Sequence, residues 1–308
     1  MGGSLSGSCV CGRNVVNING KKYFFQDNVG EGGFSYVDLL EEAKSGQFVA
    51  LKRIVCHDKK AENEALQEAE YCRMFQHENI LPLIDHCLKS KPRLSEVWLI
   101  FPFYKRGTLY DEYQRLSSTN QHIPSKRVLK LFHGICKAVE VFHQHQPVAV
   151  AHRDIKPANV LLSNEDTPII MDLGSVAPAK VEIKSFKDAQ ALQDLAAERC
   201  TMPFRAPELF QVPIHSTIDE KVDIWSLGCV LYSLMYLEGP FDQVWLKKDS
   251  VALAVQNKNL HFPNNDKYSP ELKQLVRTLM EVEPTKRPNV MWTIDQIEQL
   301  LSNESLVV

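Results

Sequence analysis

One short stretch, His152–Asn159 (HRDIKPAN), constrains the fold of this chain more than any other. Two apolar runs follow it, Val160–Leu162 and Ile169–Met171, and each has the composition of a short buried strand. The polar residues between the runs predict a turn, so the two strands should pair as a hairpin. We expect this hairpin to bring Asn159, at its start, close to Asp172, at its end.

Four polar side chains of this region suit the transfer of a phosphoryl group from ATP. That reaction needs a carboxylate for the acceptor hydroxyl, ligands for a metal ion and a cation for the developing charge. Asp154 can accept the hydroxyl hydrogen bond, and Lys156 can reach the transferring phosphate. Asn159 and Asp172 offer the hard oxygen ligands that Mg²⁺ prefers. An isolated Asp and Asn at this spacing would more simply be a solvated loop, but the ordered set favours catalysis.

The composition is that of a soluble globular protein: of 308 residues, 44% are hydrophobic and 24% are charged. The 35 basic and 38 acidic side chains nearly balance, which argues against nucleic-acid binding because that function leaves a basic footprint. No run approaches the roughly 18 apolar residues of a membrane span, and the N-terminus lacks the apolar core of a signal peptide. We expect the protein to face the cytosol.

The cysteines fall into two groups. Six of the eight are scattered singly, without the paired spacings of a zinc site, which predicts buried free thiols. These are Cys56, Cys72, Cys87, Cys136, Cys200 and Cys229. Cys9 and Cys11 instead lie in a polar segment, residues 1–18, with almost no apolar content, which predicts a flexible leader.

Three strand-like runs follow the leader, at residues 23–25, 34–40 and 48–51, and they predict a small antiparallel sheet. Glycines in Gly30–Val37 (GEGGFSYV), between the first two runs, let the backbone approach a triphosphate because they carry no Cβ. Alone, such a cluster is more often a hairpin turn. Its position one strand before Lys52 favours a phosphate loop, since Lys52 would reach the α- and β-phosphates of a nucleotide.

Helical patterns dominate the rest of the chain. Residues 62–75 and 125–143 have helical periodicity, and residues 222–231 are apolar nearly all round, as suits a helix at the centre of a domain. Residues 188–198 have the composition of a helix, with a flexible loop as the alternative. The predicted fold class is α+β, with a small β-rich N-terminal part and a larger, mostly α C-terminal part.

The motifs resemble those of eukaryotic protein kinases in order and spacing over residues 19–301. The catalytic stretch and Asp172–Gly174 match H-R-D-x-x-x-x-N and D-F-G, with Leu173 in place of the Phe. The wording of several segments resembles the Numb-associated kinase family, and within it the small myristoylated and palmitoylated serine/threonine kinases. These segments are Gly30–Val37, Pro102–Phe103, Lys105–Leu109, Arg199–Thr201 and Phe204–Phe210.

The resemblance implies a bilobal kinase fold with a leader (1–18), an N-lobe and hinge (19–104), a C-lobe (105–302) and a short tail (303–308). It implies a helical activation segment, high basal activity, and transfer from ATP with Mg²⁺, or Mn²⁺ in its place, to Ser or Thr of protein substrates and of the enzyme itself. We expect a monomer. Candidate sites of phosphorylation are Ser185 and Thr201.

The resemblance also assigns roles to residues. The implied catalytic residues are Asp154, Lys156 and Thr201, the metal ligands are Asn159 and Asp172, and the structural residues are Asp223, Glu208 and Arg287. Glu68 is the expected partner of Lys52, with Glu70 as the alternative. The implied nucleotide contacts are Gly30, Glu31, Gly32, Gly33, Phe34, Ser35, Val37, Ala50, Lys52, Glu68, Phe101, Pro102, Phe103, Tyr104, Asn159, Leu162 and Asp172.

Three further implications concern the hinge and the C-lobe. Phe101 would be the gatekeeper, and the Pro102 carbonyl and Tyr104 amide would bond the adenine edge; proline suits this position because only a carbonyl is needed. Asp223 would brace the backbone of the catalytic loop. Glu208 and Arg287 would form a buried structural ion pair.

Two alternatives to a protein kinase remain open at this point. A pseudokinase would keep the fold as a docking module, but Lys52, Asp154, Asn159 and Asp172 are all present. A small-molecule kinase would generally lack Thr201 and the Ala-Pro-Glu element that ends at Glu208.

The leader carries a pattern for lipid attachment. Met-Gly-x-x-x-Ser, completed by Gly2 and Ser6, is an N-myristoylation signal, and Cys9 and Cys11 are close enough for S-palmitoylation. One myristoyl chain binds membranes only weakly, so stable anchoring needs a second signal. An unmodified flexible tail is the simpler alternative, and zinc binding by the lone cysteine pair lacks further ligands. The resemblance implies the cytosolic face of Golgi or perinuclear membranes, with some protein in the cytoplasm.

Overall fold

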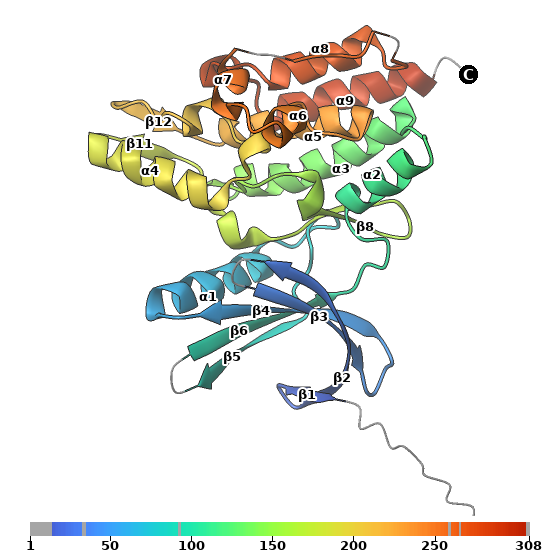
Figure 1. Ribbon diagram of the computed structural model, residues 1–308, viewed down its shortest axis with the longest axis vertical. Helices are drawn as coiled ribbons and strands as arrows, with labels where there is room; N and C mark the ends of the chain where they lie inside the picture. Colours follow the sequence, from blue (N-terminus) through green and yellow to red (C-terminus); the bar gives the residue numbers. More distant parts are fainter. Residues whose placement is uncertain (1–13, 33–34, 92–93, 258–259, 265, 306–308) are drawn as a thin grey trace, which may run out of the picture. The chain divides into compact units, whose positions relative to one another are not determined.

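A computed structural model describes residues 14–32, 35–91, 94–257, 260–264 and 266–305. The chain divides into two compact units, Met1–Glu70 with Pro82–Phe103 (unit 1), and Tyr71–Leu81 with Tyr104–Val308 (unit 2). Unit 1 is mainly a β-sheet and unit 2 is mainly helical, so the predicted α+β class is confirmed (Figure 1).

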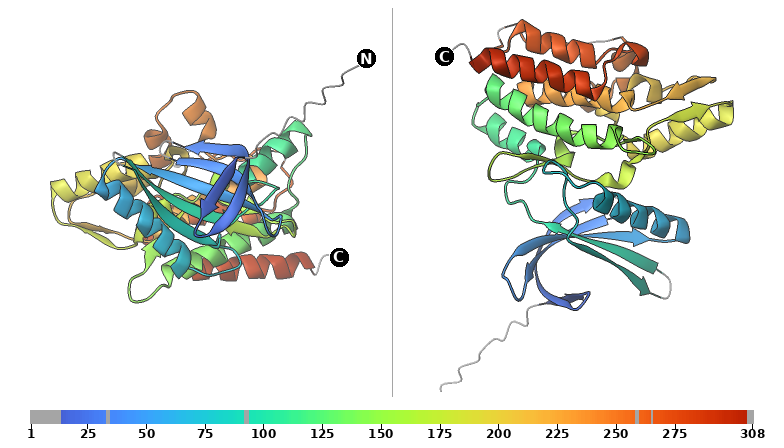
Figure 2. Two further views of the ribbon diagram at one scale, coloured as in Figure 1. Left: turned by 90° about the horizontal axis from the view of Figure 1, so that it is seen from below. Right: turned by 180° about the vertical axis from the view of Figure 1, so that it is seen from behind.

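Unit 1 contains a six-stranded antiparallel sheet in the order β1-β2-β3-β4-β6-β5. Alternate residues of its strands bury one face, including Ile18, Tyr23, Leu40 and Leu51, each with at most 1% of its surface exposed. Helix α1 begins in this unit and lies along the sheet (Figures 1 and 2). The elements are β1 (Val15–Ile18), β2 (Lys21–Gly32), β3 (Ser35–Glu42), β4 (Phe48–Cys56), α1 (Lys59–Met74), β5 (Asp85–Lys91) and β6 (Leu94–Pro102).

The sheet differs from the sequence prediction at its N-terminal end. Residues 15–18, placed in the flexible leader, form β1 and pair with Lys21–Phe24 of β2. The strand has only three apolar residues, interrupted by Asn17, so the run is too short to stand out by itself. Strand β2 is also longer than predicted and extends through Gly30 and Gly32.

Unit 2 consists of helices with short strand pairs (Figures 1 and 2). Helices α3 and α9 lie side by side, and α5 contacts both α3 and α8. The helices are α2 (Leu109–Ser118), α3 (Ser125–His143), α4 (Phe186–Arg199), α5 (Lys221–Tyr236), α6 (Asp242–Leu246), α7 (Val251–Gln256), α8 (Pro270–Leu279) and α9 (Val290–Ser305), with 3₁₀ turns at Pro157–Asn159, Leu173–Ser175, Met202–Phe204, Pro207–Leu209 and Pro284–Lys286. The strands are β7 (Val150–Ala151), β8 (Val160–Leu162), β9 (Pro168–Ile170), β10 (Ala177–Pro178), β11 (Val181–Ile183) and β12 (Ser216–Ile218).

Helix α5 is the buried helix that the apolar run 222–231 predicts. Every residue from Val222 to Met235 is buried. The Trp225 ring stacks on Phe241 with ring centroids 6.2 Å apart and planes 4° from parallel. Because it is buried on all sides, α5 packs against neighbouring segments of unit 2 and limits their movement.

Residues 188–198, for which the sequence left a helix or a loop open, lie within helix α4. The helix starts at a capping box, in which the Ser185 hydroxyl accepts from the Asp188 amide and the Asp188 carboxylate accepts from the Ser185 amide. Ala189, Leu192 and Ala196 form its buried face. The cap and this apolar stripe select the helix over a loop.

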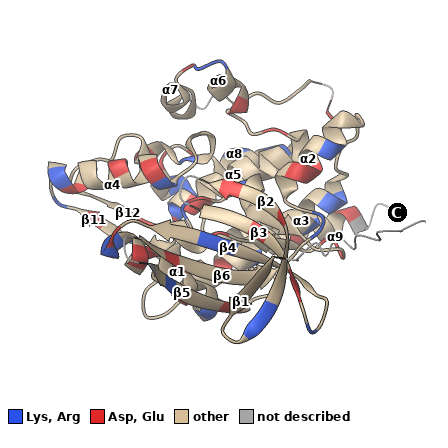
Figure 3. Ribbon diagram, turned by 60° about the horizontal axis from the view of Figure 1, so that its bottom comes forward, with Lys and Arg blue, Asp and Glu red and all other residues tan. Residues whose placement is uncertain are grey.

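Basic and acidic residues are interspersed over the elements of both units and do not gather into one basic stripe in this view (Figure 3). Within the described residues, every helix is too short or too polar to traverse a lipid bilayer. The six described cysteines are free thiols, of which only Cys87 is not fully buried.

A buried ion pair joins Glu208 to Arg287 inside unit 2. The two NηH₂ groups of the Arg287 guanidinium donate to the two Glu208 carboxylate oxygens over 2.8 and 2.7 Å. Arg287 is 2% exposed, and it also donates to the carbonyls of Val282 and Lys221. A charge this deeply buried is tolerated only because every donor has an acceptor.

We predict that Arg287→Ala lowers the free energy of unfolding by about 3–5 kcal/mol, because it leaves the Glu208 carboxylate buried without its partner. Chemical denaturation followed by fluorescence measures the change. The matched control is Lys286→Ala, whose solvent-exposed pair with Glu283 should contribute far less to stability. Equal effects of the two substitutions would contradict a structural role for the buried pair.

Candidate active site

The backbone of the catalytic stretch is held by one carboxylate of helix α5. Asp223 Oδ2 accepts from the His152 amide (2.7 Å) and Oδ1 accepts from the Arg153 amide (2.8 Å). The His143 ring Nε2 lies 3.0 Å from Oδ2. Burial acts to raise the pKa of Asp223, but the His143 hydrogen bond, the electrostatic attraction of His143 and His152, and the Arg153 amide outweigh it, so the pKa lies below its usual value. Asp223 is therefore ionised at neutral pH and fixes the loop.

Asp154 is oriented by three neighbours that the sequence assigned to the site. Its Oδ1 accepts from the Thr201 amide (2.8 Å), and its Oδ2 accepts from Lys156 Nζ (2.8 Å) and Asn159 Nδ2 (3.0 Å). Lys156 also donates to the Thr201 hydroxyl over 2.6 Å. The carboxylate is 8% exposed and held from both sides, so it presents a fixed acceptor for a substrate hydroxyl.

The β8–β9 hairpin brings Asn159 and Asp172 together, as the two apolar runs predict. Val160 pairs with Ile170, and the Met171 amide donates to the Asn159 carbonyl over 3.0 Å. Asp172 comes next and has left-handed backbone angles (φ 65°), which Asp tolerates better than most residues. Strand β9 runs Pro168–Ile170, one residue earlier than predicted.

The Asn159 and Asp172 side chains fit a magnesium site in which the protein supplies only one or two ligands. Within the parts of the chain that the structure describes, no three His, Cys, Asp or Glu side chains group as metal ligands. Mg²⁺ does not need such a group, because it keeps waters and takes phosphate oxygens beside one or two protein ligands. The Asp172 carboxylate and the Asn159 side-chain oxygen would hold it, since the Asn159 nitrogen is already engaged by Asp154.

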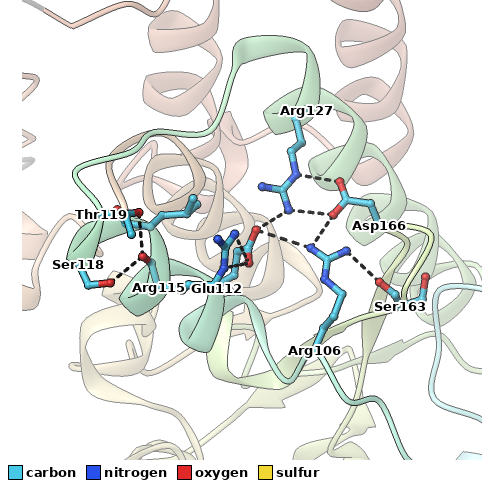
Figure 4. Close-up of polar contacts among 9 residues, drawn as sticks. Arg106, Glu112, Arg115, Ser118, Thr119, Arg127, Ser163 and Asp166 are labelled. Carbon is cyan, nitrogen blue, oxygen red and sulfur yellow. Dashed lines mark hydrogen bonds and ion pairs between the residues drawn. The ribbon is translucent and has the colours of Figure 1, made fainter.

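An ion-pair network anchors the far end of the same hairpin (Figure 4). Asp166, in the β8–β9 turn, accepts two hydrogen bonds of 2.8 Å from Arg127 and lies 3.0 Å from Arg106. Arg106 also donates to the Ser163 carbonyl (3.0 Å), and Arg127 donates to the buried Glu112 (2.7 Å). The network ties α2, α3 and the turn together, so the β8–β9 hairpin is fixed at both ends.

The acids of this network are held in their charged form. Hydrogen bonding from Arg127, the largest effect, lowers the pKa of Asp166. Burial acts to raise the pKa of Glu112, but hydrogen bonds from Arg127 and Arg115 outweigh it and lower the pKa. These residues were not predicted from the sequence, because charged side chains on separate elements do not indicate which of them will form ion pairs.

In unit 1, Lys52 forms an ion pair with Glu68. The Lys52 Nζ to Glu68 Oε1 distance is 2.8 Å, and Glu68 is buried while Glu70 is exposed. The structure therefore pairs Lys52 with the expected glutamate and not with the alternative. The ion pair fixes the position of the Lys52 ammonium, as is needed for a group that binds phosphate.

The other residues expected at the nucleotide lie as follows. Gly30 faces Val37 across β2 and β3, and Ala50 faces Phe101 across β4 and β6. Glu31, Gly32 and Ser35 lie at the adjoining ends of β2 and β3, Pro102 ends β6, Phe103 and Tyr104 follow it, and Leu162 is buried at the end of β8. Gly33, Phe34, Gly2, Cys9 and Cys11 lie outside the described residues.

A family model described as "Protein kinase domain" matches residues 23–302, and the chain belongs to the protein kinase family. It is similar to serine/threonine-protein kinase 16 of Rattus norvegicus (48% identity) and of Homo sapiens (47%), each over 95% of this chain and 94% of the relative. Serine/threonine-protein kinase ppk13 of Schizosaccharomyces pombe is 34% identical over 92% of each chain. The protein is a serine/threonine protein kinase, as predicted, and the family uses ATP with a divalent cation.

The geometry assigns each step to a side chain. Asp154 would accept the hydrogen bond of the substrate hydroxyl and orient its oxygen, while the Lys156 ammonium, placed between Asp154 and Thr201, would offer positive charge to the transferring phosphate. When bound, Mg²⁺ supplies neutralisation of the phosphate charge. Asp172 and Asn159 would hold that ion, and Lys52, fixed by Glu68, would hold the phosphates.

We predict that Asp154→Ala retains ATP affinity but lowers kcat by about 100-fold or more, because only the positioning of the acceptor is lost. Asp172→Asn should instead raise the Mg²⁺ concentration needed for half-maximal rate, since a neutral ligand replaces an anionic one. Steady-state kinetics over a Mg²⁺ series, with nucleotide binding by calorimetry, separates the two effects. The control is Asp295→Asn at an exposed position of α9, and equal Mg²⁺ dependence of Asp172→Asn and wild type would disprove the metal assignment.

Proposed function

We propose that this kinase is a membrane-anchored member of the Numb-associated family that acts on the cytosolic face of Golgi membranes in secretory traffic. The observation that carries the proposal is the Met-Gly-x-x-x-Ser start followed by Cys9 and Cys11. It is supported by similarity to serine/threonine-protein kinase 16 along 95% of the chain, in line with the motif wording.

The physical argument favours two acyl groups over one. A single myristoyl chain associates with membranes with a constant of about 10⁴ M⁻¹, which is marginal and reversible. Few basic residues lie in or near the leader, namely Arg13, Lys21 and Lys22, so electrostatic attraction to anionic lipid is a weak second signal. Palmitoylation of Cys9, Cys11 or both supplies a stronger one.

The acylated segment lies apart in sequence from the residues of the candidate active site. The first described strand begins at Val15, beyond both cysteines, and Asp154 and its partners lie far along the chain in unit 2. The kinase is proposed to act as a monomer on protein substrates and on itself, with Ser185 and Thr201 as candidate acceptors.

We predict that Gly2→Ala moves the protein from membranes to the cytosol, because myristoylation needs an N-terminal glycine once Met1 is removed. The double variant Cys9→Ser with Cys11→Ser should keep weak, rapidly exchanging membrane association. Membrane flotation and photobleaching recovery of a tagged full-length protein measure both. Gly3→Ala is the matched control, and firm membrane binding of Gly2→Ala would contradict acyl anchoring.

A further inference from the structure

A groove of about 760 Å³ in unit 2 runs from the catalytic residues to the short helix α6. Asp154 and Thr201 line one part, and Glu238, Trp245 and Leu246 line another. The groove is thus continuous with the carboxylate that receives the substrate hydroxyl. A polypeptide that places its Ser or Thr at Asp154 can extend along the same groove.

The wall formed by α6 exposes large apolar side chains. Trp245 is 50% exposed and Leu246 is 70% exposed, and α6 itself buries none of its residues. Tyr110, at the start of α2, lines the same groove and is 53% exposed. Single exposed apolar residues are ordinary, but several that share one groove with a catalytic carboxylate indicate a surface that becomes covered when substrate binds.

The charges of the groove are balanced near Asp154 and unbalanced near α6. Lys156 pairs with Asp154, and Arg205 donates to the Cys200 carbonyl and lies over the Phe210 ring. Arg199, a third basic residue of the groove, lies 3.8 Å from Glu198 and donates to a backbone carbonyl. The cations of this part of the groove are therefore engaged inside the protein.

Near α6 the carboxylates have only neutral partners among the described residues. Glu238 is exposed and accepts from the Gln243 amide over 2.9 Å, and Asp242 accepts from the Gly239 amide over 2.6 Å. Lys247 and Lys248 follow α6 and are exposed, but they do not line the groove. This end of the groove carries net negative charge beside an apolar wall.

We propose that Glu238, Trp245 and Leu246 determine substrate specificity, selecting protein segments in which a Lys or Arg and a large apolar residue stand together at a fixed distance from the acceptor Ser or Thr. The carboxylate of Glu238 pairs with the basic side chain, and the α6 wall covers the apolar one. The inference rests on the serine/threonine kinase activity and specifies which protein segments it acts on.

A positional-scanning peptide library with a central Ser or Thr, phosphorylated by the full-length protein, tests the proposal. We expect one position to favour Lys or Arg and a nearby position to favour large apolar residues. Glu238→Lys should then lower kcat/KM for the best Lys- or Arg-containing peptide by about tenfold, through a higher KM, because attraction becomes repulsion. For the same peptide with Glu in place of that Lys or Arg, Glu238→Lys should raise kcat/KM. Trp245→Ala with Leu246→Ala should remove the apolar preference alone.

The controls separate specificity from general damage. Glu238→Gln keeps a side chain that can bond Gln243 and should lose the basic preference without gaining an acidic one. Asp295→Lys, an exposed charge reversal on α9, should leave all preferences unchanged. If Glu238→Lys has a normal kcat and the same preference for basic peptides as wild type, the specificity proposal is wrong while the kinase activity stands. Absence of transfer to every peptide overturns it together with the activity on which it rests.

Discussion

The buried carboxylate of Asp223 is the interaction on which the rest of the active site depends. It accepts the amides of His152 and Arg153, and it is supplied by the most deeply buried helix of unit 2. A loop would otherwise sample many backbone conformations, and fixing each residue costs about 1–2 kcal/mol. Two strong hydrogen bonds to a charged acceptor offset part of that cost at the residues just before Asp154.

From this anchor the positions of the reacting groups follow in order. Asp154 is oriented by Thr201, Lys156 and Asn159, and Asn159 is brought to Asp172 by the β8–β9 hairpin. The hairpin in turn is held at its turn by the arginine network described above. Asp154, Lys156 and Asn159 are thus fixed by one another, which limits how far any one of them can move.

Much of this site could be predicted because residues 152–172 hold four of the candidate catalytic and metal-binding residues, and because the resemblance to protein kinases supplied distant ones such as Thr201 and Asp223. The strands beside Asn159 and Asp172 and the α5 helix are short-range patterns, and the residue types at Asp154 and Lys156 follow from the chemistry. Strand β1 was missed because its apolar run is too short to stand out, although it pairs with the very next strand. The arginine network was missed because its members come from separate elements: Arg127 meets Asp166 across 39 positions. Local patterns predict elements well, but they do not predict which charged side chains meet once the elements pack.

The most direct test of this account is Asp223→Asn, which keeps the size of the side chain but removes its charge and one acceptor. Hydrogen exchange should show faster exchange of the amides around His152 and Arg153, with the global melting transition retained, and kcat should fall by about 100-fold because the reacting groups lose their positions. A folded variant with the same exchange at these amides but a reduced rate, or with loosened amides and wild-type kcat, would contradict the claim that Asp223 positions the catalytic loop.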